Sequence, residues 1–289
     1  MQFIGLKKVA AVLVLLVGGI SLPPESEQYR QTILADKKLK PVELLSRYQH
    51  YDFSALWLKT GKTGMQNADE SVLGFIGNDY QRLRIKLLMV RPDPQQSGRY
   101  LVTGKSKVKE SILPFQGVFR LLHVREAVAL PYGLDGAPVP AVKSGILLAE
   151  YELREPVDQL NSGVFRGILR TNWYLDRKGK MQYDNIEFGY SDRFNNNQFV
   201  GIWQSYKTKS IKRCNWGDWR IPDGRRLDAK RMYDSALDVG AGDFHPDSLY
   251  LTKGWQSYQD ARLLPVDLTE AEKRAKQKAQ KTEFAEWWK

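Results

Sequence analysis

The chain has 289 residues, of which 42% are hydrophobic, so it can bury a sizeable core and intrinsic disorder is excluded. The formal net charge is +11, and the single cysteine, Cys214, excludes an intramolecular disulfide and is expected to be buried. No histidine pair, nucleophile elbow or phosphate-binding loop occurs in the sequence, so we expect no metal and no cofactor.

The N-terminus predicts a secretory signal peptide over residues 1–21. Lys7 and Lys8 precede a short apolar run, and Pro23 and Pro24 follow a small-residue exit at Ser21. The run is shorter than the roughly 20 residues that span a bilayer, and an uncleaved anchor is the alternative. Because no cysteine follows the signal, we expect no lipid attachment. The mature protein is expected to be exported, periplasmic or extracellular, with its oligomeric state open.

Residues 22–50 are predicted to form a helical extension outside the main domain. The stretch 25–38 has weak helical character, and Pro41 can begin a second short helix. From Tyr51 onward apolar and polar residues alternate, which is typical of strands.

Residues 51–210 are predicted to form an antiparallel β-domain of about eight strands. In the clearest strand, 82–91, Leu83, Ile85 and Leu87 share one face. Other segments with strand character are 53–58, 72–77, 100–109, 112–125, 145–154, 163–175, 181–190 and 199–207. The Pro- and Gly-rich stretch 128–142 must be a loop, and a loop of this length is often functional.

Eight antiparallel strands can close into a small up-and-down barrel. A curved β-sandwich would show the same alternation, so both architectures stay open. Phe165, Leu169 and Trp173 fall on one parity of their strand, which is predicted to face the core.

The segments Gly163-Val-Phe165-Arg-Gly167 and Phe199-Val-Gly201-Ile-Trp203 resemble the calycin barrels of the lipocalin and avidin type. The resemblance covers roughly Tyr51 to Ser210 and concerns architecture alone. It implies a cup that binds a small or lipid-like molecule, and it carries over no binding residue.

Residues 211–266 are predicted to wrap the barrel as an irregular, basic segment that carries tryptophans. Flat indole faces beside cations suit sugar rings with anionic groups. We expect a ligand site at one barrel end, with the loop 128–142 near it, formed by Trp203, Lys209, Lys212, Arg213, Trp216, Trp219 and Arg220. The alternative is that the tryptophans are packing residues and the charges a solvated surface.

A weaker set of catalytic candidates consists of Glu150, Glu152, Asp218, Asp243 and His245. Glu150 and Glu152 lie about 7 Å apart on one strand face, near the separation of inverting glycosidases. With Arg154 on the same face, the pattern is also typical of an exterior strand with cross-strand ion pairs.

Residues 267–289 are predicted to contain a C-terminal helix from Glu270 to about Trp287. Thr269 and Glu272 form a capping box, and the apolar end of the helix is expected to dock on the domain.

The sequence as a whole predicts an exported, non-catalytic cell-envelope protein that binds a small or anionic ligand, glycan or lipid-like, and no nucleic acid. Peripheral contact with the envelope stays open. A glycan-processing hydrolase and a structural or docking component of the envelope are the alternatives.

Overall fold

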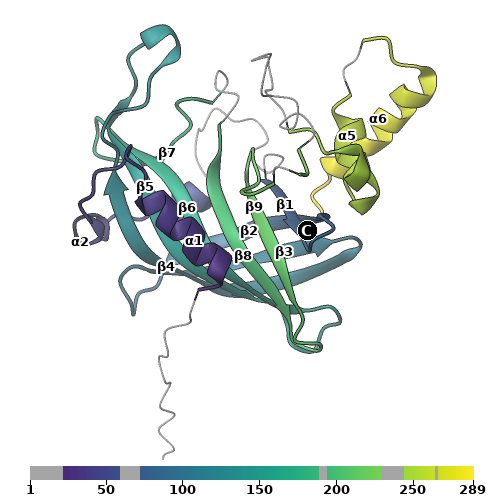
Figure 1. Ribbon diagram of the computed structural model, residues 1–289, viewed down its shortest axis with the longest axis horizontal. Helices are drawn as coiled ribbons and strands as arrows, with labels where there is room; N and C mark the ends of the chain where they lie inside the picture. The colour runs from purple at the N-terminus through teal and green to yellow at the C-terminus, as the bar shows by residue number, and fades with distance from the viewer. Residues whose placement is uncertain (1–21, 59–71, 189–193, 225, 229–243, 264–265) are drawn as a thin grey trace, which may run out of the picture.

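The computed structural model describes residues 22–58, 72–188, 194–224, 226–228, 244–263 and 266–289, and the expected signal peptide, residues 1–21, lies outside these ranges. Nine antiparallel strands form one sheet that closes nearly into a ring, so the protein is mostly β (Figure 1). The strands are β1 (Val72–Ile76), β2 (Gln81–Pro92), β3 (Arg99–Val108), β4 (Ser111–Glu126), β5 (Ala141–Arg154), β6 (Gly163–Asp176), β7 (Met181–Tyr183), β8 (Asn196–Ser205) and β9 (Ile211–Asp218).

The ring follows the order of the chain. Each strand from β1 to β6 pairs with the next, β6 pairs with β8, β8 with β9, and β9 returns to β1. The strand β7 pairs with the far end of β6. The seam between β1 and β2 is narrow, with Phe75 opposite Arg82 and Ile76 opposite Gln81. The architecture is therefore barrel-like.

The alternation of the sequence located most strands close to their observed positions, but three segments differ. Of residues 181–190, predicted as one strand, only Met181–Tyr183 form β7; residues 184–188 are not in a strand, and 189–190 lie outside the described residues. Residues 53–58, predicted as a strand, contain the helix α3 (Ser54–Leu58), whose first turn is fixed because the amide of Ser54 donates to Asp52 Oδ1 at 2.8 Å. Residues 211–218, predicted as irregular, form β9, which pairs on both sides. The sheet therefore runs from Val72 to Asp218.

The middle of the barrel is filled by aromatic side chains, as an eight-stranded barrel is only wide enough for side chains to fill it. Phe199 and Trp216 stack with ring centroids 4.5 Å apart, and Tyr151 meets both at 5.2 to 5.3 Å. Room for Tyr151 comes from Gly167 and Gly201, which lie opposite each other; a Cβ on Gly201 would lie 2.3 Å from the Tyr151 hydroxyl. The parity predicted to face the core does so.

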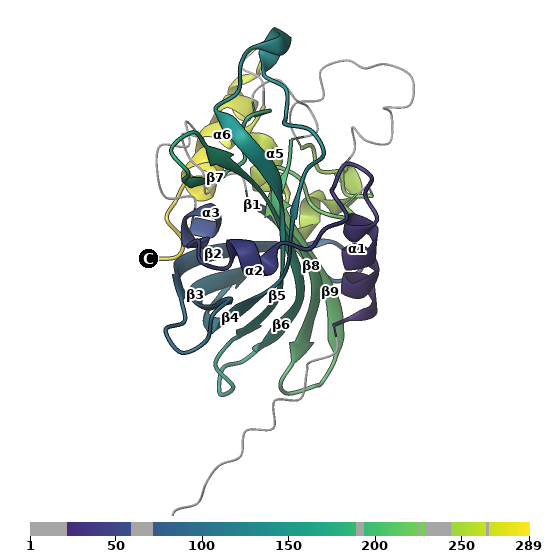
Figure 2. The same cartoon turned by 90° about the vertical axis from the view of Figure 1, so that its left-hand side faces the viewer.

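Helices cover the outside and one end of the barrel (Figures 1 and 2). The helix α1 (Pro24–Leu34) lies along the outer side of β6 and β8, with Tyr29 and Ile33 against Ile168 and Val200. The helices α2 (Leu45–Tyr48) and α3 lie at one open end, called here the helix end. The opposite end, where β1–β2, β3–β4, β5–β6 and β8–β9 turn, is called the hairpin end. Among the described residues, no helix is long and apolar enough to cross a membrane.

The C-terminal segment packs on the outside of β1 and β2. It consists of η3 (Ser248–Lys253), α5 (Gln256–Ala261) and α6 (Glu270–Glu283), and α6 begins with the predicted capping box. A buried ion pair joins Arg82 to Glu283 at 2.5 Å. Beyond the helix, the rings of Trp287 and Trp288 lie against Arg84 and Lys86. The C-terminal helix docks on the domain as predicted, but it ends at Glu283 instead of near Trp287, and Phe284 stays 47% exposed.

Candidate functional site

The residues predicted to form one ligand site are distributed along β9 instead. Lys209 and Lys212 lie at the hairpin end, whereas Trp219 and Arg220 follow the other end of the strand. Trp216 lies between them in the aromatic core and is 2% exposed. Because β9 is an extended strand that runs from one end of the barrel to the other, Lys209 and Arg220 lie at opposite ends. The predicted irregular segment could have brought them to one end.

Three of these residues make contacts within the fold. Arg213 pairs with Asp223 at 2.5 Å and lies over the Phe75 ring on the outer wall. Arg220 is buried, 3.8 Å from Asp228, and the ring of Trp219 meets Phe188. The loop 128–142, which contains η2 (Leu134–Gly136), lies at the helix end. It is therefore far along the barrel from Lys209 and Lys212.

Among the described residues, the carboxylates considered for catalysis do not form one cluster. Glu150 pairs with Arg120, and Glu152 pairs with Arg154 and Arg166 on the outer wall, as the ion-pair interpretation predicted. His245 is half-buried beside Phe244, and Asp243 lies outside the described residues. Asp218, in contrast, is buried at the helix end.

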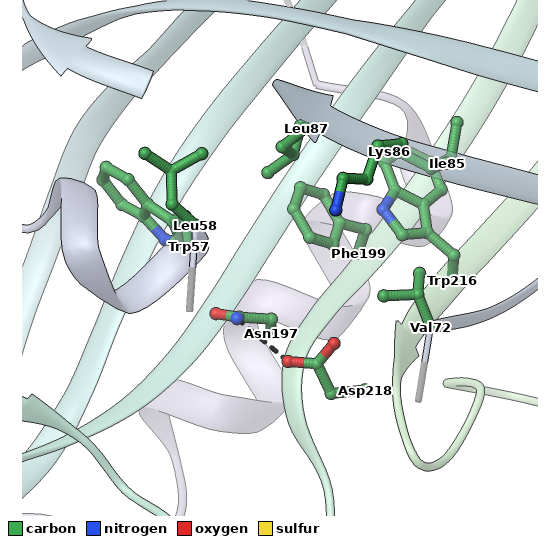
Figure 3. A pocket seen from close by; sticks show the side chains of 10 residues that line it. All are labelled: Trp57, Leu58, Val72, Ile85, Lys86, Leu87, Asn197, Phe199, Trp216 and Asp218. Atoms are coloured by element: carbon green, nitrogen blue, oxygen red, sulfur yellow. Dashed lines mark hydrogen bonds between the residues drawn. The ribbon is translucent and has the colours of Figure 1, made fainter. Parts of the chain in front are cut away.

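A buried hydrogen-bond network surrounds Asp218, and Figure 3 shows its bond to Asn197. Tyr183 and the Asn197 amide donate to Asp218 Oδ2 at 2.9 and 3.0 Å. Asn197 Oδ1 accepts from Thr171, and Thr171 accepts from the Trp57 indole, at 2.9 and 3.0 Å. Burial, followed by the charge of Asp218, raises the pKa of Tyr183, so this hydroxyl stays a donor. The network connects α3 to β6, β7, β8 and β9.

The space beside this network is small. Trp57 lines one side and Phe199 and Trp216 the other, with Lys86 and Asp218 completing the polar part (Figure 3). The cavity measures about 40 Å³, which accommodates a water molecule or two and no larger ligand. We assign this network to fixing the helix end.

The hairpin end contains a much larger cavity, of about 440 Å³. Its walls come from all four turns at this end of the barrel, so chain segments far apart in sequence surround one space. The lining comprises Ile76, Asp79, Gln81, Ser106, Val108, Lys109, Ser111, Leu113, Glu155, Asn161, Phe165, Trp203 and Lys212. Ligand cavities in proteins have volumes of about 300 to 1,000 Å³ and commonly occupy barrel mouths.

Glu155 is a buried ionisable group of this cavity and is 5% exposed. Its Oε1 accepts from the Ser106 hydroxyl at 2.5 Å, and its Oε2 accepts from the Gly163 amide at 2.8 Å and the Trp203 indole at 3.0 Å. Burial raises the pKa of Glu155, although the three donors oppose the shift. The carboxyl therefore fixes the orientation of Trp203.

Two lysines stand at the cavity rim. Lys212, which faces Trp203 across the β8–β9 pair, has its Nζ 5.9 Å from the centre of the Trp203 ring. Lys109 lies at the β3–β4 turn and is exposed. The rim acid Asp79 pairs with Lys253 at 3.2 Å. Of the predicted ligand residues, the structure thus brings Trp203 and Lys212 together at one cavity.

Glu155 was not among the predicted residues, because the candidate acids were those with a second carboxylate, a tryptophan or a histidine close by in the sequence. A usable signal was present: Glu155 continues the inward parity of Tyr151 and Leu153, directly before Pro156. A carboxyl on a core-facing position needs hydrogen-bond partners, and such a position is therefore informative.

The fold and this cavity define a mostly β, barrel-like protein with a filled middle and one hollow end. Comparison with protein-family models, curated proteins and solved structures finds no significant match for this chain.

Proposed function

We propose that the protein binds a small anionic ring-bearing ligand, such as an acidic sugar, in the hairpin-end cavity and does not transform it. The observation that carries the proposal is the combination of the Trp203 ring, held by Glu155, with Lys212 beside it. Ring faces next to a cation suit a sugar ring that bears a carboxylate or phosphate group.

The proposed architecture is a calycin-like cup that is accessible at one mouth. The consecutive antiparallel meander supports this assignment. Because aromatic side chains fill the middle of the barrel, a ligand would be held near the mouth, with Phe165 and Trp203 in the wall and Lys109 at the rim. A shallow, partly polar cavity favours a compact ring over a long acyl chain.

We further propose that the protein acts in the cell envelope after export. The lysine-flanked apolar run near the N-terminus supports this location. The excess of positive charge would raise the local concentration of anionic envelope components around the protein.

Titration calorimetry against a panel of acidic mono- and disaccharides tests the proposal. Replacing Lys109→Ala together with Lys212→Ala should weaken binding at least about tenfold, because each lysine provides a charge-assisted contact. Lys207→Ala with Lys209→Ala is the matched control, since both lysines are exposed in the neighbouring β8–β9 turn but do not line the cavity.

The proposal is contradicted if no panel member binds, or if binders respond equally to the two pairs of substitutions. Chromatography of the ligand after long incubation tests the absence of catalysis. Release of a shortened sugar would favour the hydrolase alternative.

A further inference from the structure

The loop that joins β4 to β5 presents apolar side chains to the outside. It stands out beyond the barrel in both views (Figures 1 and 2). The exposed fractions are 62% for Val128, 40% for Leu130, 76% for Tyr132 and 57% for Leu134, and Val142 at the start of β5 is 49% exposed. Within residues 127–142 the only charged side chain is Asp135. A projecting apolar surface of this kind indicates an interaction site.

The loop does not complete the core of the barrel. A cavity of about 590 Å³ separates it from the outer wall, where Ile146, Arg170 and Asn172 lie. The base of the loop is fixed, because the amide of Ala127 donates to Ser144 O and that of Val128 donates to Lys38 O, both at 2.8 Å. The exposed side chains therefore lie beyond a tethered base.

Cations border this apolar surface. In the β5–β6 pair Ala141 lies opposite Asp176, which brings the β6–β7 turn next to the base of the loop. That turn exposes Arg177, Lys178 and Lys180, and the segment beneath the loop exposes Lys37 and Lys38. The exposed acids on the loop and on the segment beneath it are Asp36 and Asp135, and the acids Asp176, Asp184 and Glu187 nearby are half-buried. Among the exposed charges, the five cations therefore outnumber the two acids. An apolar tip within a mainly cationic border is complementary to an anionic lipid surface.

We infer that the protein docks on an anionic phospholipid bilayer through the β4–β5 loop, with the side chains of residues 128–134 in the interfacial layer and the bordering cations at the headgroups. Tyrosine is a preferred residue at that depth. An irregular loop is tolerated there because headgroups and water still satisfy its backbone polar groups. The hairpin-end cavity, at the opposite end of β5, would then face away from the bilayer and stay open, so docking does not depend on the proposed ligand.

A fluorescent probe on the loop tests docking directly. Cys214 is fully buried, so one introduced cysteine can be labelled with an environment-sensitive dye in the folded full chain. Leu134→Cys reports on the loop, and Leu160→Cys is the matched control, because Leu160 is 75% exposed in the β5–β6 connection at the hairpin end. Vesicles of mixed phosphatidylglycerol and phosphatidylcholine should shift the loop dye to the blue. Pure phosphatidylcholine should not, and the control dye should respond to neither.

Vesicle co-sedimentation measures the strength of the contact. Leu130→Ser with Leu134→Ser should lower the partition coefficient at least about tenfold, since several buried methylene groups are lost. Val157→Ser with Leu160→Ser removes comparably exposed apolar groups at the other end and should leave partitioning unchanged. The charge reversals Arg177→Glu with Lys178→Glu should also lower the partition coefficient on anionic vesicles relative to wild type. Added salt should lower it for the wild-type protein as well. Circular dichroism verifies that each variant is folded.

Three results would overturn the inference. The loop dye could remain unshifted on anionic vesicles, or both dyes could shift equally. A shift without vesicles that grows with protein concentration would show instead that a second copy of the chain covers the loop.

Discussion

Replacing Glu155 tests whether this buried carboxyl organises the hairpin end. In Glu155→Ala the Gly163 amide and the Trp203 indole lose their acceptor, and the Ser106 hydroxyl loses its shorter contact. A buried donor left without a partner costs about 1–3 kcal/mol, so the free energy of unfolding should fall by roughly 3–5 kcal/mol. In the matched variant Glu155→Gln, the amide oxygen can still accept from the Gly163 amide and the Trp203 indole, and the amide nitrogen can donate to the Ser106 hydroxyl. It should change the free energy of unfolding by about 1 kcal/mol or less.

The pH dependence gives a second, independent readout. Because the folded protein raises the pKa of Glu155 above its ordinary value of 4.5, the folded state retains the proton to higher pH than the unfolded state. The contribution of protonated Glu155 to the free energy of unfolding is fully present below pH 4.5, and it is lost as the pH rises through the raised pKa. Wild type should therefore lose stability relative to Glu155→Gln over that interval.

Urea denaturation at a series of pH values measures both effects. The reasoning is refuted if Glu155→Ala costs less than about 1 kcal/mol, or if wild type gains stability relative to Glu155→Gln as the pH rises.

Two further predictions concern the two ends of the chain. Burial alone would raise the pKa of Glu283, but Arg82, Ser257 and Arg84 together lower it to about 2. The stability from this group is therefore complete above pH 4.5 and is lost as the pH falls towards 2. Glu283→Gln should cost about 3 kcal/mol and increase hydrogen exchange in α6, because it breaks a buried ion pair. Glu270→Gln, at an exposed pair with Lys273, should cost at most about 0.5 kcal/mol, and equal costs would contradict the assignment. At the N-terminus, mass spectrometry of the purified protein should show that residues 1–21 have been removed, and an intact Met1 would contradict the predicted export.

The fold was largely predictable because a half-buried antiparallel strand has a strict period of two. Two of the errors have clear physical causes. The apolar run at residues 53–58 is too short for its period to distinguish a helix from a strand. The helix is favoured because the Asp52 carboxylate accepts from the Ser54 amide in the first turn. In β9 the basic residues suggested an irregular surface segment, although Cys214, Trp216 and Asp218 alternate along the strand and face the interior.

The candidate site was predictable only in part. Trp203 and Lys212 could be singled out because their residue types suit an anionic ring. Glu155 could have been singled out by its inward parity, but its partner Ser106 could not, because their hydrogen bond joins β3 to the β5–β6 connection and the sequence does not show which turns meet around one cavity. Conversely, Pro and Gly identified residues 128–142 as a loop, but not which end of the barrel it occupies.

The narrow seam between β1 and β2 has a consequence for how the chain reaches its native state. Gly74 in β1 lies opposite Trp216 in β9, so the first strand of the ring finds its main partner only after the whole meander has been made. Pairings between residues so distant in sequence form slowly. Until then β1 and the free side of β2 are open edges to which another chain can add. Ring closure is thus a late step of folding, and it cannot precede the synthesis of β9.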